Sequence, residues 1–108
     1  MPQAYLSAVL TAPQKVDLRE APFPPKLEAN EVLIEVAAAG ICGTDLAIYS
    51  GEYRVPLPLV LGHEFSGRVV ESSAGARGKW LVGRWVTAEI NNTCVAYGRR
   101  SRCEACRR

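Results

Sequence analysis

Hydrophobic and polar residues alternate in several short segments of this chain, which is the pattern of half-buried β-strands. Residues 5–10 and 15–20 are two such segments, and the turn that contains Pro13 lies between them. We therefore expect an antiparallel hairpin at the start of the chain. Residues 31–38 alternate most strongly and predict a buried strand. The apolar residues that would share one face of that strand are Val32, Ile34 and Val36.

The rest of the chain adds short strands and little helix. Thr44 or Asp45 can cap a short helix through Tyr49, because small polar residues favour the first position of a helix. Residues 65–71 and 80–90 predict two further strands, with a glycine-rich loop over 72–79 between them. This order predicts a mainly β fold, a small barrel-like architecture with little helix, over residues 1–108 as one domain.

Charge and composition narrow the class of protein. The hydrophobic fraction of 48% suits a folded domain, and the net charge is +2. Five of the thirteen basic residues fall in the last ten positions, which leaves eight basic against ten acidic residues in the remainder. No aromatic residues are interleaved with these arginines, so we expect no nucleic-acid partner. No apolar run approaches the length of a membrane span or a signal sequence, and we expect a cytoplasmic protein without a membrane partner.

Candidate chemistry begins with the only histidine of the chain, His63, in the stretch LVLGHEFSG. Taken alone, such a histidine is ordinarily a core or rim residue. Cys42 offers a thiolate at a predicted strand-to-helix turn, and thiolate with imidazole is a donor pair that zinc prefers. The long spacing excludes a compact finger but allows two loops to meet. Glu64 would lie beside the metal, and Asp45 could accept the second imidazole N–H.

A second group of candidate ligands comprises Cys94, Cys103 and Cys106. The last two form a CxxC pair, which is typical of both zinc sites and redox sites. Four cysteines, unevenly spaced, favour metal or catalytic use over a disulfide framework.

The segments GICGTDL at residues 40–46 and LGHEFSGRVVE at residues 61–71 closely resemble the zinc-dependent medium-chain alcohol and polyol dehydrogenases. The resemblance extends over nearly the whole chain and concerns the N-terminal, GroES-like catalytic domain of that family, a partly open barrel. It implies that Cys42 and His63 are catalytic-zinc ligands and that Glu64 ligates zinc or exchanges with water. It further implies that Thr44 passes on the alcohol proton and that Asp45 orients the histidine.

The resemblance also implies cofactors and partners. The reaction would be oxidation of a small alcohol or polyol by zinc-assisted hydride transfer to NAD or NADP, in an enzyme that forms a homo-oligomer. Residues 91–108 would begin a lobe for a second, structural Zn²⁺, held in part by Cys94, Cys103 and Cys106. No GxGxxG turn occurs in the chain, so we expect the dinucleotide to bind mainly to a further domain and these residues alone to be inactive.

Three features depart from the family pattern. Ala47 stands where the family often has a histidine that ends the proton relay. The usual Gly-Asp-Arg-Val is Gly83-Arg84-Trp85-Val86 here. The segment between Cys94 and Cys103 is about six residues longer than expected from the family, and the family's fourth cysteine would fall after residue 108, so we expect these residues alone not to complete the second metal site.

Three alternative functions stay open from the sequence. A metal ribbon built on the three later cysteines and the arginines would bind nucleic acid, but it leaves GICGTDL and GHE unexplained. A non-catalytic binding domain of the same GroES-like architecture would hold Cys42 and His63 without metal, since architecture does not fix function. A zinc-independent quinone or enoyl reductase relative would generally lack that pair.

Overall fold

The chain consists of two separate units built mostly from β-strands. A computed structural model gives the structure, and it describes residues 4–22, 26–90, 93–94 and 98–107, with the side chains at 76 and 77 excepted. One unit, which we call the hairpin unit, comprises Met1–Lys26 and Ala39–Phe65. The other, the cysteine unit, comprises Leu27–Ala38 and Ser66–Arg108. The expectation of a mainly β, GroES-like chain with little helix is confirmed.

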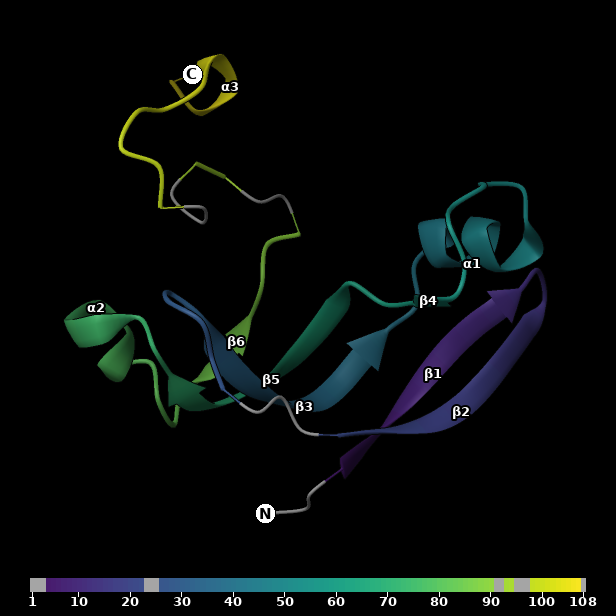
Figure 1. Cartoon of the computed structure of the whole chain (residues 1–108), viewed down its shortest axis with the longest axis horizontal. Helices are drawn as coiled ribbons and strands as arrows, with labels where there is room; N and C mark the ends of the chain where they lie inside the picture. Colours follow the sequence, from purple (N-terminus) through teal and green to yellow (C-terminus); the bar gives the residue numbers. More distant parts are fainter. Residues whose placement is uncertain (1–3, 23–25, 91–92, 95–97, 108) are drawn as a thin grey trace. The chain divides into compact units, whose positions relative to one another are not determined.

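The sheet of the hairpin unit is formed around the first strand. Strand β1 (Ala4–Ala12) pairs antiparallel with β2 (Lys15–Pro22) on one side and with the short β4 (Leu59–Val60) on the other (Figure 1). Leu10 lies opposite Val16 and Leu59 in these two ladders and is 0% exposed. The predicted hairpin is therefore present, and its first strand also fixes a segment some fifty residues later, where Val9 lies opposite Val60.

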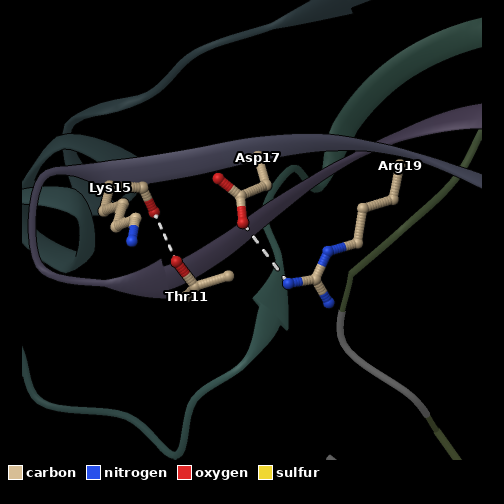
Figure 2. A network of polar contacts seen from close by, with 4 residues as sticks. All are labelled: Thr11, Lys15, Asp17 and Arg19. Atoms are coloured by element: carbon tan, nitrogen blue, oxygen red, sulfur yellow. Dashed lines mark hydrogen bonds and ion pairs between the residues drawn. The ribbon is translucent and has the colours of Figure 1, made fainter.

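The hairpin turn at Pro13 and Gln14 has a backbone conformation that suits its residues. Pro13 fits the second position of a turn, and Gln14 follows with φ 63°, the left-handed conformation that the third position of a type II turn requires. Figure 2 shows the surface contacts beside the turn, where the Thr11 hydroxyl donates to the Lys15 carbonyl at 3.4 Å. Arg19 and Asp17 form an exposed ion pair at 3.3 Å in the same view. Exposed pairs of this kind contribute little to stability.

One helix belongs to the hairpin unit. Helix α1 (Gly43–Ser50) begins after Cys42, which is its N-cap residue, and ends at Gly51 with φ 88°. Glycine adopts this left-handed conformation without the cost a side chain would bring, so it terminates the helix. The predicted helix is present, but it begins earlier than a cap at Thr44 or Asp45 would place it.

The cysteine unit contains most of a second sheet. Its strands are β3 (Val32–Gly40), β5 (Glu64–Ser72) and β6 (Trp85–Thr87), in the order β3-β5-β6, and β5 is antiparallel to β6. The last residues of β3 and the first of β5 belong to the hairpin unit. Gly67 sits against β3 so closely that an added Cβ would lie 2.3 Å from the Glu35 carbonyl oxygen.

Two predictions for the later part of the chain are wrong. The expected loop over 72–79 contains the short helix α2 (Gly75–Lys79), and the expected strand over 80–90 is reduced to β6. Turn hydrogen bonds explain the second difference, since the Leu81 amide donates to the Gly78 carbonyl and the Arg84 amide to the Leu81 carbonyl. A further one-turn helix, α3 (Glu104–Arg107), lies in the last described segment.

The expectation that residues 31–38 form a buried strand is also wrong in its burial. Strand β3 exists, but its residues are half-buried or exposed, and the Val36 side chain is 56% exposed. Alternation predicts that one face is apolar, whereas burial requires another layer over that face. Within the described ranges, only Leu10, Val69 and Cys94 are buried hydrophobic residues. Across the same ranges, no helix has the length and apolar character needed to span a bilayer.

Candidate metal centre

Cys42 and His63 come from two loops of the hairpin unit and meet at one point. Cys42 lies between β3 and α1, and His63 lies between β4 and β5 after Gly62, which has φ 113°. Both side chains are half-buried. The Cys42 Sγ is 3.1 Å from the His63 Nε2, although the residues are 21 positions apart. The structure therefore brings together the two residues that the sequence singles out.

Glu64 completes a cluster of three donor types. It is the first residue of β5, and one ligand atom from each of Cys42, His63 and Glu64 lies within 4.8 Å of the others. Gly40, at the end of β3, leaves room for its carboxylate, since an added Cβ at that glycine would be 3.3 Å from Glu64 Oε2. A thiol, an imidazole and a carboxylate thus face one small volume.

Asp45 is in contact with both of the first two residues. It is 6% exposed, and one carboxylate oxygen, Oδ2, accepts a hydrogen bond from the Cys42 amide at 3.1 Å. The other oxygen, Oδ1, is 3.5 Å from His63 Nδ1, which is longer than an ordinary hydrogen bond but close enough to orient the ring. With Nδ1 directed at Asp45, Nε2 is the nitrogen that faces the thiol. Asp45 therefore accepts a hydrogen bond at the start of α1 and also faces the histidine.

The chemistry of these donors fits zinc. Zinc binds thiolate sulfur at about 2.3 Å and imidazole nitrogen at about 2.0–2.1 Å, in a tetrahedral arrangement. Two such ligands on one tetrahedral ion stand about 3.6 Å apart by these bond lengths. The observed 3.1 Å between Cys42 Sγ and His63 Nε2 is thus within about half an ångström of that separation. A small opening of the pair is enough to accommodate the ion.

Thr44 lies in the first turn of α1, next to Asp45, and is exposed. Its position puts the hydroxyl one residue from the carboxylate that contacts both candidate ligands. Among the described contacts, none joins Thr44 to Cys42, His63 or Glu64. Its predicted part in proton transfer stays a prediction.

The three later cysteines form a second cluster, in the cysteine unit. Their sulfur atoms all lie within 4.8 Å of one another. The Cys103 amide donates to Cys94 Sγ at 3.3 Å, and the Cys94 amide donates to Cys106 Sγ at 3.4 Å. All four cysteines of the chain are free thiols. The structure therefore gathers these three residues, despite the longer segment between the first and second of them.

Hydrogen bonding shifts the pKa of two of these thiols in opposite directions. The backbone hydrogen bond from Cys103, followed by its thiol, lowers the pKa of Cys94 from 9.0 to about 7, against the effect of burial. For Cys106, the hydrogen bond from the Cys94 amide lowers the pKa, but the neighbouring thiols of Cys103 and Cys94 outweigh it and the net pKa is raised. Cys94 is accordingly more readily available than Cys106 as a thiolate for a metal.

Sequence reasoning missed three supporting features of the first site. These are the Cys42 amide bonded to Asp45, the space at Gly40 beside Glu64, and a pair of hydrogen bonds between Gln14 and Tyr49. Gly40 and the turn that contains Pro13 are visible in the sequence as local signals. Neither signal indicates which residue, distant in the sequence, would lie in contact with it.

Comparisons with a family model and with individual proteins all match this chain to alcohol dehydrogenase-type proteins. The family described as "Alcohol dehydrogenase GroES-like domain" matches residues 28–108. An uncharacterized zinc-type alcohol dehydrogenase-like protein of Haemophilus influenzae is 36% identical over 97% of this chain and 32% of its own length. The sorbitol dehydrogenase of Bacillus subtilis strain 168 is 35% identical over 99% of this chain and 29% of its own.

A solved structure has a similar fold. The acetophenone reductase of Geotrichum candidum NBRC 4597, determined in complex with NAD, superposes with a TM-score of 0.80 at 31% identity. The match covers 99% of this chain and 30% of that one. The chain thus spans less than a third of the length of each of these proteins.

Proposed function

This chain belongs to the alcohol dehydrogenase GroES-like domain family, and we propose that it forms the catalytic-zinc part of a dehydrogenase. The substrate would be a small alcohol or polyol, because one similar protein is named a sorbitol dehydrogenase. The observation that carries the proposal is the meeting of Cys42, His63 and Glu64 around one volume, with 3.1 Å between the first two donor atoms.

In this proposal the side chains have separate tasks. Cys42 and His63 hold the ion, and Glu64 supplies a third ligand or a carboxylate that exchanges with water. Bound zinc would act as a Lewis acid toward the alcohol oxygen. Asp45 keeps the imidazole in the tautomer whose Nε2 is free to bind, as carboxylates beside zinc-bound histidines commonly do.

The alcohol proton needs a route away from the site. We assign its acceptance to the Thr44 hydroxyl, which is exposed in the first turn of α1 and can both donate and accept. Ala47, one turn further along α1, has no group that could carry the proton onward. The proton would therefore leave Thr44 through water or through another group of the enzyme.

Hydride transfer requires a dinucleotide, and we propose NAD or NADP in that role. The acetophenone reductase with a similar fold was determined with NAD. No GxGxxG turn lies within the 108 residues, so the dinucleotide would bind mainly to other parts of the enzyme, and we expect no dehydrogenase activity from these residues alone. The homo-oligomeric state and the cytoplasmic location stay predictions from the sequence.

We further propose that Cys94, Cys103 and Cys106 are three of the ligands of a structural zinc. Three thiols within 4.8 Å, one of them with a pKa of about 7, are a donor set suited to zinc. The two sites would serve different ends, since the first combines mixed donors with an exposed side and the second consists of sulfur alone.

Zinc binding tests the proposal, because each site can be removed separately. The single histidine gives one set of imidazole NMR signals, which report binding at the first site and nowhere else. We expect zinc to shift these signals in the unaltered chain and in Cys103→Ser, but not in Cys42→Ser. Zinc content should fall by one equivalent per chain in Cys42→Ser.

Two results would decide for another function. If zinc does not shift the His63 signals, and the stability of the chain is the same with and without the metal, the chain is a GroES-like binding domain. If this metal-free chain were joined to a dinucleotide domain and reduced a quinone or an enoyl thioester, the zinc-independent class would be correct.

A further inference from the structure

The N-terminal hairpin is connected to both segments that supply the candidate zinc ligands. Along β1, Val9 and Leu10 pair with Val60 and Leu59 of β4, three residues before His63. At the hairpin turn, Gln14 bonds to Tyr49 in the last turn of α1, the helix that begins after Cys42 (Figure 1). The two ligands are thus attached, by separate routes, to the same strand pair.

The contact between the turn and α1 is reciprocal. The Gln14 amide donates to the Tyr49 carbonyl at 2.8 Å, and the Tyr49 hydroxyl donates to the Gln14 carbonyl at 3.2 Å. Both groups on Gln14 belong to the backbone, which points them at the helix because the residue has φ 63°. We call this pair of hydrogen bonds the Gln14–Tyr49 clasp.

Gly51 keeps the clasp closed. It follows α1 with φ 88°, and an added Cβ would lie 3.3 Å from both Cβ and Cγ of Pro13. The absence of a side chain at residue 51 therefore favours the close approach of the helix end and the hairpin turn. A methyl group there would oppose the left-handed backbone and press on the proline ring.

We propose that the Gln14–Tyr49 clasp is a positioning element of the zinc site. By tying the end of α1 to the hairpin that also holds β4, it restricts the movement of Cys42 relative to His63 before the metal arrives. Restricting ligands in advance reduces the ordering that binding must impose and so tightens binding. This inference rests on the proposed zinc site, and Tyr49 acts in it through the helix, not by touching the metal.

The test is the zinc affinity of Tyr49→Phe, measured with buffered zinc through the imidazole signals of the single histidine. Losing one hydrogen bond of the usual net strength should weaken binding about three- to tenfold. Tyr53→Phe is the matched control, because it removes the same hydroxyl from a tyrosine that is 58% exposed just beyond the helix. We expect its affinity to equal that of the unaltered chain.

Two more variants separate positioning from simple loss of structure. Gln14→Gly keeps both backbone groups of the clasp and favours its left-handed conformation, so affinity should be unchanged. Gly51→Ala opens the junction from the other side and should weaken zinc binding at least as much as Tyr49→Phe. In each variant, unfolding by urea without metal and the Co²⁺ spectrum of the site show whether the fold is intact and the ligand geometry altered.

The outcomes distinguish this inference from the proposed function. If the unaltered chain binds zinc at His63 and Tyr49→Phe binds it within twofold of the same affinity, the clasp has no positioning role. A loss of affinity matched by an equal loss in Tyr53→Phe would also overturn it. If the unaltered chain shows no zinc response at His63, the proposed zinc site itself is wrong, and the inference falls with it.

Discussion

Asp45 shows how much one residue contributes to the site. Its carboxylate touches the backbone of one candidate ligand and faces the ring of the other, and it is nearly buried. A buried carboxylate needs such partners, because an uncompensated charge away from water is costly. The helix N-terminus therefore does more than supply a cysteine, since it also holds the carboxylate that lies 3.5 Å from His63 Nδ1.

Asp45→Asn should weaken zinc binding about 10- to 100-fold, the range typical for partners of metal-bound histidines. The amide can accept the Cys42 N–H or the imidazole N–H with its oxygen, but it cannot present two carboxylate oxygens and loses the negative charge. The imidazole NMR titration measures the effect. Asp17→Asn makes the same chemical change in the exposed pair of Figure 2 and should leave zinc affinity unaltered. Equal affinities for both variants would contradict the role given to Asp45.

Cys94 gives a pH dependence whose sign follows from its surroundings. The fold lowers its pKa from 9.0 to about 7, so its contribution to stability is complete above pH 9 and disappears as the pH falls through 7. The pKa of Cys106 is raised, so its contribution is present below 9.0 and is lost at higher pH.

We therefore expect the metal-free chain to gain stability between about pH 7 and pH 9 and to gain no more above that range. Urea unfolding with chelator and reductant at several pH values provides the measurement. Cys94→Ser should show a smaller rise over the same interval. Parallel profiles for the two proteins would mean that this thiol is not responsible.

At the scale of elements, the hairpin, α1 and most strand centres are readable from the sequence, because alternation and turn residues are local signals. The prediction from the sequence fails where burial depends on whether another layer of the fold covers the strand. Strand β3 has the pattern of a buried strand, but its residues are half-buried or exposed. Trp80 also fits a strand by composition, yet it precedes a turn that ends at Gly83, with φ 87°.

The close approach of β5 to β3 at Gly67 can be tested by substitution. An added methyl group would meet the Glu35 carbonyl oxygen at 2.3 Å and Ile34 Cγ2 at 2.8 Å, so the strands must separate locally. Gly67→Ala should lower the free energy of unfolding by about 1–3 kcal/mol, as overpacking usually does. Urea denaturation gives the value.

Gly43→Ala is the control for that substitution, because no heavy atom lies within 4 Å of its added Cβ. In the first turn of α1, alanine should change the free energy of unfolding by no more than about 1 kcal/mol. A similar loss in both variants would show that glycine content, and not the close approach of β3 and β5, matters.

At the scale of the whole chain, the pairing of Cys42 with His63 could be anticipated because the motifs around them resemble a known family. The reason they meet could not. We place that reason in hydrogen bonds between residues 35 positions apart, Gln14 and Tyr49, and in the pairing of a two-residue strand, β4. Such contacts leave no periodic trace in a single sequence.

Metal removal should therefore affect the stability of the chain as well as its chemistry. Zinc at 100 times its dissociation constant should raise the free energy of unfolding by about 2.7 kcal/mol per site, since it binds the folded form. Chelator should reverse the effect, and Cys42→Ser should abolish the share that belongs to the first site. Denaturation midpoints in buffered zinc measure this. If the denaturation midpoint of the unaltered chain does not change with zinc concentration, both proposed sites are contradicted.

The place of β1 in the chain also has a consequence for biosynthesis. This strand is translated just before β2 and can pair with it at once, but its second partner, β4, is translated some fifty residues later. During that interval one edge of β1 is open to pairing with any other nascent chain. Pairing with β4 closes that edge and at the same time fixes the backbone three residues before His63, so protection of the strand and placement of the imidazole depend on the same ladder.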